Sequence, residues 1–177
     1  MAAPYTTIGH SNRGLDEFVD ILRGAGVRLV VDVRSFPRSR SNPVFNTDTL
    51  PGDLASVQIG YSHLPALGGR RRVQPDVDDA LNALWRVRSF HNYADHALGG
   101  EFADALDEVV RAGRERRLAL MCSEAVWWRC HRRIIADHLL ARGHEVDHLM
   151  GAGRIEPARL TQGARRTEEG QVVYPAA

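Results

Sequence analysis

Met121-Cys-Ser-Glu-Ala-Val-Trp-Trp-Arg-Cys-His-Arg-Arg133 is the segment of this chain that brings most of its reactive side chains together. It follows the apolar run Leu118–Met121 and opens a helical pattern over Val126–Ala141, which predicts a strand that turns directly into a helix. In open α/β folds such a turn lies at the carboxyl edge of the sheet, where ligands bind. Both cysteines of the chain, Cys122 and Cys130, lie in this segment. The segment therefore predicts a fold class and the position of a functional site.

On both sides of this segment, short apolar runs alternate with helical patterns. The expected strands are Tyr5–Gly9, Val27–Val33, Gly60–Leu64, Leu118–Met121 and Glu145–Met150, and the expected helices are Leu15–Ala25, Leu50–Val57, Val77–Val87, Leu98–Ala112 and Val126–Ala141. Val27–Val33 is β-branched without polar alternation, which is typical of a strand covered on both faces. The alternation predicts a single-domain, three-layer α/β fold with a mostly parallel sheet flanked by helices.

The length of 177 residues suits one domain with a proper core. We expect residues 1–155 to form the α/β domain and residues 156–177, which are polar and rich in Gly, Arg and Glu, to form a loose C-terminal tail. The net charge of +1 indicates no partner by itself. All 23 basic residues are arginine, so Schiff-base chemistry and a P-loop lysine are excluded.

The sequence carries no signal of secretion or of membrane insertion. Its start lacks the apolar region of a signal peptide, and no apolar run approaches the roughly 20 residues that span a bilayer. Two cysteines are too few for a disulfide framework. We therefore expect a cytoplasmic protein with reduced thiols and no membrane partner.

The residues that follow each strand of a parallel sheet converge at one edge, because all the strands end there. Polar side chains gather at these positions and in one covering segment. The candidate ligand-binding residues are His10, Ser11, Asp32, Arg34, Arg38, Arg40, His63, Tyr93 and Arg132. Arginine suits bidentate binding of phosphate or carboxylate, so the set predicts a pocket for an anion.

Cys122 is the candidate reactive centre of this pocket. Its expected place just before a helix favours a thiolate, because the helix N-terminus stabilises negative charge. We assign Cys122 as nucleophile or redox centre, Glu124 as acid/base, and His131 as the group that tunes or relays protons. The structural alternatives are a buried apolar thiol for Cys122, a helix cap for Glu124 and a core histidine for His131.

Two other chemistries fit the same segment less well. Phosphatase and rhodanese loops wrap an anion with a shorter Cys-to-Arg spacing than the six residues that separate Cys122 from Arg129. On the expected helix, Cys130 and His131 would point about 100° apart, and the spacing matches no usual zinc pattern. We therefore predict no cofactor and no metal, with Cys122 and Cys130 as the ligands of the weaker metal alternative.

The chain resembles the DUF488 family through ordered motifs along most of its length. These are Thr7-Ile-Gly-His-Ser-Asn-Arg13, Asp32-Val-Arg34, Pro37-Arg-Ser-Arg40, Asn42-Pro-Val-Phe45, His63-Leu-Pro-Ala-Leu-Gly-Gly69, Tyr93-Ala-Asp95 and Cys122-Ser-Glu-Ala-Val-Trp-Trp-Arg-Cys-His-Arg132. Gly14 departs from the family, which more often has a Ser or Thr helix cap there. The resemblance implies an α/β domain with a pocket built from these motifs, and it implies no particular reaction.

The leading hypothesis is an enzyme that acts on an anionic, phosphate- or nucleotide-like small molecule through Cys122. In this hypothesis the anion is held by His10, Ser11, Arg34 and Arg132, with Arg38 and Arg40 at the entrance. One alternative is a non-catalytic nucleic-acid-binding protein, with loop arginines for phosphates and tryptophans for stacking. The other is a redox- or metal-sensing protein that uses Cys122 and Cys130.

Overall fold

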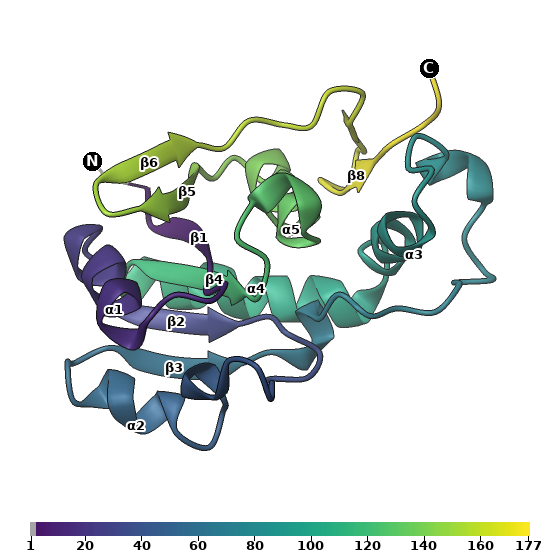
Figure 1. Ribbon diagram of the computed structural model, residues 1–177. Helices are drawn as coiled ribbons and strands as arrows, with labels where there is room; N and C mark the ends of the chain where they lie inside the picture. The colour runs from purple at the N-terminus through teal and green to yellow at the C-terminus, as the bar shows by residue number, and fades with distance from the viewer. Residues whose placement is uncertain (1–2) are drawn as a thin grey trace.

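The computed structural model describes residues 3–177 and shows a six-stranded sheet between two layers of helices (Figure 1). The strands are β1 (Tyr5–Gly9), β2 (Leu29–Asp32), β3 (Gly60–His63), β4 (Leu118–Cys122), β5 (Val146–Gly151) and β6 (Arg154–Pro157). The α-helices are α1 (Leu15–Gly24), α2 (Leu50–Ala55), α3 (Arg88–His96), α4 (Gly100–Glu115) and α5 (Arg132–Ala141). Short 3-10 helices cover Pro43–Phe45, Pro65–Leu67, Asp79–Asn82 and Trp127–Arg129, and β7 (Arg165–Arg166) pairs with β8 (Val172–Val173). The predicted three-layer α/β fold is confirmed.

The strand order, β3-β2-β4-β1-β5-β6, places β1 and β4 side by side at the centre of the sheet. All pairings are parallel except that of β6 with β5. The helix that follows β1 covers one face of the sheet, whereas the helix that follows β4 covers the other (Figure 1). The connections therefore diverge at the carboxyl ends of β1 and β4, and such a switch point leaves a crevice where ligands bind in open α/β folds.

The two helix layers form separate cores on the two faces of the sheet. On one face α1 and α2 bury Phe18, Leu22 and Leu54, whose helical spacing turns them toward the sheet. On the other face α3, α4 and α5 bury a larger set that includes Phe102 and Ile135. In residues 3–177 no helix combines the length and the apolar character that crossing a bilayer requires.

The helix expected over Val126–Ala141 begins later, at Arg132. The carbonyls of Glu124 and Ala125 accept hydrogen bonds from the Arg132 guanidinium, so they are not used by helical N–H groups. Trp127 stacks on His148 of β5, which draws the loop away from a helical path. Cys122 therefore does not precede a helix, and the prediction that the helix dipole stabilises its thiolate, or that Glu124 caps a helix, is wrong.

Two other segments also differ from the sequence-based expectation. Val77–Val87 forms only the 3-10 turn Asp79–Asn82, and α3 begins at Arg88. The chain beyond Gly151 is not loose, because β6 pairs with β5, and Val172 and Tyr174 are fully buried. The Tyr174 hydroxyl donates to Asp137 on α5 over 2.7 Å. Strand pairing, buried side chains and hydrogen bonds together dock the C-terminal segment despite its polar composition.

Candidate functional site

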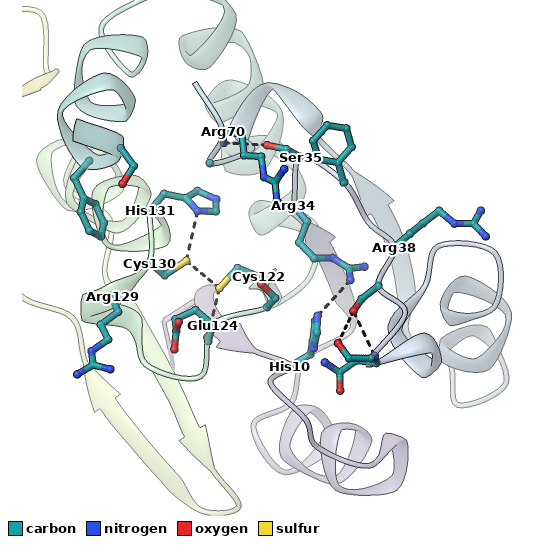
Figure 2. Close-up of a pocket in the computed structure, with 18 residues that line it drawn as sticks. His10, Arg34, Ser35, Arg38, Arg70, Cys122, Glu124, Arg129, Cys130 and His131 are labelled. Atoms are coloured by element: carbon teal, nitrogen blue, oxygen red, sulfur yellow. Dashed lines mark hydrogen bonds between the residues drawn. The ribbon is translucent and has the colours of Figure 1, made fainter. Parts of the chain in front are cut away.

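A cavity of about 580 Å³ opens at the carboxyl ends of β1, β2 and β4 (Figure 2). Of the predicted site residues, it is lined by His10, Arg34, Arg38, Cys122, Glu124 and His131. The pairing of β1 with β4 sets Gly9 opposite Cys122, and the loops continue side by side, since Ser11 N–H donates to the Ser123 carbonyl. A Cβ at Gly9 would clash with the Glu124 carbonyl, so glycine permits this close approach. The predicted convergence of strand ends thus produces a hollow at the switch point.

The two thiols meet at the floor of this cavity. Cys122 ends β4, and the loop that follows brings Cys130 back, so that the two sulfur atoms lie 3.0 Å apart (Figure 2). Both cysteines are free and almost fully buried, and both line the cavity. The Cys130 thiol donates a hydrogen bond to Cys122 Sγ. The sequence left open whether these thiols approach each other, and the structure shows that they do.

The environment of the pair lowers the pKa of Cys122 and raises that of Cys130. Burial alone would raise the pKa of Cys122, but the hydrogen bond from Cys130 and the charge of Arg132 together outweigh it. For Cys130, burial and the hydrogen bond to Cys122 both raise the pKa well above its usual value. Of the two thiols, Cys122 is therefore the one that ionises more readily.

Arg132, the first residue of α5, is fully buried and is not part of the cavity lining. Its guanidinium donates to the carbonyls of Glu124 and Ala125, both over 3.1 Å, and to the Thr7 hydroxyl. Within residues 3–177 no carboxylate lies within ion-pair distance of this guanidinium. Because an uncompensated buried charge is costly, the Cys122 thiolate is the natural counter-charge.

His131 completes the thiol side of the site as a neutral imidazole. Its Nε2 donates to the Val33 carbonyl over 3.0 Å, so Nδ1 carries no proton and lies 3.5 Å from Cys130 Sγ. Burial is the main cause that lowers the pKa of His131 to about 4. Gly69 packs against the ring, since a Cβ there would lie 2.6 Å from Nδ1. The imidazole is held with a proton acceptor facing Cys130.

The opposite wall of the cavity is built from a second ionic cluster. Arg34 bonds Asp32 through Nε at 2.9 Å and Nη2 at 2.7 Å, and Tyr61 donates to the same carboxylate. His10 Nδ1 donates to the Ser11 carbonyl, so Nε2 of the neutral ring is an acceptor. Nε2 accepts a hydrogen bond from Arg34 Nη1 over 3.3 Å. Burial is the main cause that lowers the pKa of His10. Asp32 serves as the counter-ion of Arg34 and does not line the cavity.

The remaining predicted residues support the walls or lie outside the cavity. His63 bonds the Arg34 carbonyl over 2.7 Å, and Tyr93, which is fully buried, donates to the Leu67 carbonyl over 2.8 Å. Ser11 adopts a positive φ of 50° to follow the β4 loop. Arg40 is exposed and, like these three, is not part of the cavity lining.

Several cavity residues were not assigned to the site from the sequence. They include Ser35, Phe36, Asn42, Gly69, Arg70, Ser89, Phe90, Ser123 and Arg129, whereas Cys130 was named only for the metal and redox alternatives. Arg129 lines the cavity because α5 begins after it. The adjacent glycines Gly68 and Gly69 could have indicated the loop that carries Arg70 in the sequence, because they let its backbone approach Ser35 and His131 closely.

The cavity lining is strongly basic. It carries the four guanidinium groups of Arg34, Arg38, Arg70 and Arg129 against the single carboxylate of Glu124. Phe36 lies at the rim with 66% of its surface exposed, and the Arg70 guanidinium lies 5.2 Å from its ring centre. Such a lining favours an anion, and the exposed ring offers an apolar face beside it.

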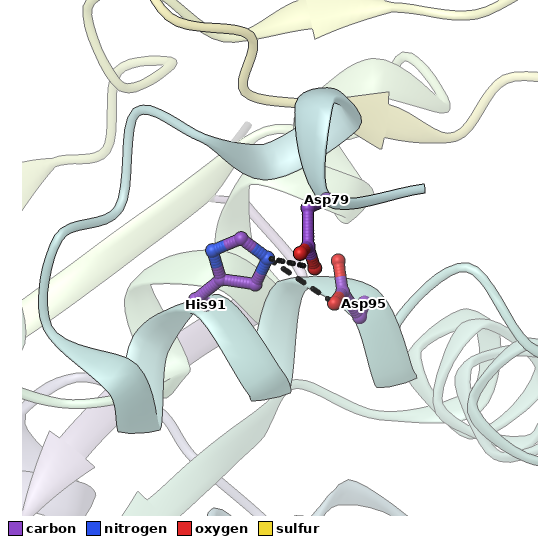
Figure 3. Close-up of side chains that lie close together, drawn as sticks. All are labelled: Asp79, His91 and Asp95. Atoms are coloured by element: carbon purple, nitrogen blue, oxygen red, sulfur yellow. Dashed lines mark ion pairs between the residues drawn. The ribbon is translucent and has the colours of Figure 1, made fainter. Parts of the chain in front are cut away.

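Among the described residues, the grouping that could hold a metal ion lies outside the cavity. Asp79, His91 and Asp95 offer ligand atoms within 4.8 Å of one another (Figure 3). The side chain of Asp79 is 86% exposed, and His91 Nε2 lies 3.3 Å from Asp95. A protonated His91 would satisfy both carboxylates without a metal. Neither thiol belongs to such a grouping in residues 3–177.

The chain matches the family model "Domain of unknown function DUF488" over residues 14–139. Because this match covers more than half of the 177 residues, the chain belongs to the DUF488 family. The resemblance seen in the sequence is thereby confirmed. No curated protein and no solved structure matches the chain significantly. The matched range contains both thiols and the Asp32–Arg34 pair, whereas His10 precedes it.

Proposed function

We propose that this DUF488 protein is a thiol-dependent enzyme that acts on an anionic, phosphate- or nucleotide-like small molecule. The observation that carries the proposal is the buried Arg132 guanidinium, which has no carboxylate partner in residues 3–177, bonds the loop that follows Cys122 and lowers the pKa of that thiol. A buried cation of this kind stabilises the thiolate, which is the nucleophilic form of cysteine. The cavity lies at the switch point of the sheet.

The anion would be held by the arginines whose charge is not already compensated. Asp32 neutralises Arg34, so this residue mainly orients His10 and closes the floor of the cavity. Arg70 and Arg129 are exposed on opposite rims, and Arg38 joins them from the loop after β2. Guanidinium groups bind phosphate with paired hydrogen bonds. Arg38 and Arg129 point away from the thiols in Figure 2, so they would turn inward to enclose an anion with Arg70.

The chemical step would begin with attack of the Cys122 thiolate on the bound molecule. Cys130 keeps its proton and donates a hydrogen bond to the thiolate. His131 Nδ1 lies beside the Cys130 sulfur and helps to hold it in place. Glu124 stands exposed at the rim as the acid/base for the leaving group or for water. The mechanism needs no resident cofactor, and it needs reduced thiols, which fits a cytoplasmic location.

Alkylation of Cys122 by iodoacetamide tests the proposal directly. We expect the rate to reach half its maximum at a pH below about 8.5, the value for an unperturbed thiol, and inorganic phosphate to slow it. Arg70→Met and Arg129→Met should each weaken this protection, whereas Arg154→Met on the edge strand β6 should not. A half-maximum at or above the ordinary value, or an alkylation rate that no phosphate or nucleotide alters, would overturn the proposal.

Binding of single-stranded nucleic acid is a second candidate, favoured by the exposed Phe36 ring beside Arg70. Arg38 and Arg40 on the adjacent loop are exposed as well. Trp127, one of the expected stacking residues, is instead covered by His148. Titration of a fluorescent oligonucleotide across salt concentrations decides this candidate. Affinity should fall steeply with salt if several phosphates are bound, and a flat response or no binding removes it.

A further inference from the structure

We propose that Cys122 and Cys130 form a peroxide-sensitive dithiol site, in which oxidised Cys122 is resolved by Cys130 as an intramolecular disulfide. The inference rests on the proposed function only for the thiolate at Cys122, and it is independent of which anion the cavity binds. In this inference Cys130 is the resolving thiol and His131 Nδ1 accepts its proton. Attack of Cys122 on a bound anion requires neither role.

The two sulfur atoms are already close to bonding distance. They lie 3.0 Å apart, and a disulfide needs about 2.05 Å, so the sulfurs must approach by roughly 1 Å. Cys130 lies in extended backbone between a 3-10 turn and the start of α5, and no strand pairing restrains it. Both thiols line the cavity, which gives a small peroxide access to an otherwise buried pair.

In the first step the Cys122 thiolate attacks one oxygen of a hydroperoxide. The S–O bond forms and the O–O bond breaks, which leaves Cys122 as a sulfenic acid and releases an alkoxide or hydroxide that takes a proton from water. The sulfur is oxidised by two electrons and the peroxide is reduced by two. Low-pKa, accessible thiols next to a resolving cysteine are the ones that undergo this reaction.

In the second step Cys130 attacks the Cys122 sulfenic acid. The Cys130 proton passes to His131 Nδ1, 3.5 Å away, the S–S bond forms and the S–O bond breaks. The departing hydroxide takes the proton back from His131 and leaves as water. One peroxide is thereby converted into an alcohol or water plus a second water, and a low-molecular-weight thiol would restore the dithiol.

The electrostatics of the pair set the order of these steps. After burial, the causes that raise the pKa of Cys130 are its hydrogen bond to Cys122 and the negative charge of Cys122. Both weaken once Cys122 is a neutral sulfenic acid, so Cys130 loses its proton more readily only after the first oxidation. Cys130 thus stays protonated and unreactive until Cys122 has been oxidised.

The disulfide would also remove the negative charge of Cys122 that compensates Arg132, whose guanidinium in residues 3–177 bonds only neutral oxygens. The oxidised form therefore holds an uncompensated buried cation. This unfavourable electrostatic energy makes the disulfide easy to reduce. Oxidation would therefore inactivate the nucleophile reversibly. A cycle of this kind protects Cys122 from irreversible oxidation.

Hydrogen peroxide added to the reduced full-length protein tests the inference by thiol counting and intact mass. We expect the two free thiols to disappear together, with the loss of two hydrogens and full recovery with dithiothreitol. Cys130→Ser should instead accumulate a sulfenic acid that dimedone traps and that progresses to sulfinic acid. Arg154→Met, on the edge strand β6 and outside the cavity, should behave like the wild type. Addition of oxygen to the wild-type mass, without loss of both thiols, would overturn the inference.

His131→Gln separates the proton acceptor from a structural role, since glutamine can still donate to the Val33 carbonyl. Sulfenic acid should form at the wild-type rate, but its conversion to the disulfide should be at least about tenfold slower near neutral pH. The defect should shrink as pH rises, because Cys130 then ionises unaided. A pH-independent defect, or none, would remove His131 from the relay.

These outcomes are distinguishable from failure of the proposed function. Disulfide formation without anion protection of Cys122 would leave the inference standing and remove the anionic substrate. Fast alkylation with anion protection, but without a disulfide, would do the reverse.

Discussion

Two arginines at the same edge of the sheet, Arg34 and Arg132, are buried in contrasting ways. Arg34 after β2 is bound through two nitrogens by the carboxylate of Asp32. Arg132 at the start of α5 is more deeply buried, yet its bonds go to two carbonyls and a hydroxyl. Both positions were expected to bind a ligand, but the structure gives them different tasks.

Under the proposed function, the contrast separates a side of the cavity that stabilises the fold from a side that would carry the chemistry. A carboxylate neutralises Arg34 permanently, so that cluster stabilises the fold and orients His10. No carboxylate compensates the charge of Arg132, and an ionised Cys122 would do so. The buried guanidinium therefore favours the thiolate and lowers the pKa of Cys122. Substitutions on the two sides should therefore have different readouts, stability for one and thiol reactivity for the other.

The largest expected effect follows from Asp32→Asn, which leaves the Arg34 charge buried without a counter-ion. The free energy of unfolding should fall by about 3–5 kcal/mol, the range for breaking a buried ion pair, as measured by urea denaturation. The double variant Asp32→Asn/Arg34→Met should recover much of this loss, since it removes the unpaired charge. A single variant as stable as the wild type would show that the pair contributes nothing net.

Arg132→Met should act on the thiol more than on stability. Removing the guanidinium raises the pKa of Cys122, and a rise of about one unit, equivalent to 1.4 kcal/mol, makes alkylation near neutral pH about tenfold slower. The loss of unfolding free energy should be smaller than for Asp32→Asn, because this change removes an uncompensated charge. If Arg132→Met alkylates as fast as the wild type, Arg132 is not the counter-charge of the thiolate.

Tyr61→Phe tests the cluster around Asp32 and Arg34 through the pH dependence of the unfolding free energy. Burial and the hydrogen bond to Asp32 raise the pKa of Tyr61 from 10.0 to about 12. Its contribution is therefore fully present below pH 10 and is lost as the pH rises toward 12, because the unfolded chain ionises first. Tyr61 is partly exposed, so we expect the variant to lose only about 1 kcal/mol at neutral pH. Its stability should then decline less steeply than that of the wild type between pH 10 and pH 12.

Cys130→Ala tests the hydrogen bond to the Cys122 sulfur. This hydrogen bond lowers the pKa of Cys122 more than the charge of Arg132 does, so its loss should slow alkylation near neutral pH by at least about tenfold. Cys130→Ser keeps a donor and should lie between the wild type and the alanine variant. Equal rates for all three proteins would show that the hydrogen bond between the sulfurs does not tune the nucleophile.

Most of the fold could be predicted from the sequence because strand and helix patterns are local. The five expected strands and four of the five expected helices appear close to their predicted bounds, apart from the late start of α5. The late start of α5 results from side-chain contacts that the helical pattern does not record. Trp127 packs on β5 and Arg132 bonds the preceding loop, so a helical pattern did not become a helix there.

Part of the candidate site could be predicted for the same reason. Strand ends in a parallel sheet converge, so His10, Arg34 and Cys122 were placed together correctly. Which side chains face the cavity could not be predicted, because that depends on the path of each loop. Arg129 faces the cavity and Arg132 turns away from it, although both come from one short segment.

By itself, the sequence determined the α/β class, the parallel sheet and the types of side chain at its carboxyl edge. These follow from the spacing of apolar residues along the chain, and that spacing reflects local backbone geometry. The tertiary structure alone decided that Cys130 returns to Cys122, that Arg132 is buried without a carboxylate and that the C-terminal segment docks on α5. The partners of buried polar groups are chosen by which segments meet in space, and no periodicity along the chain records that choice.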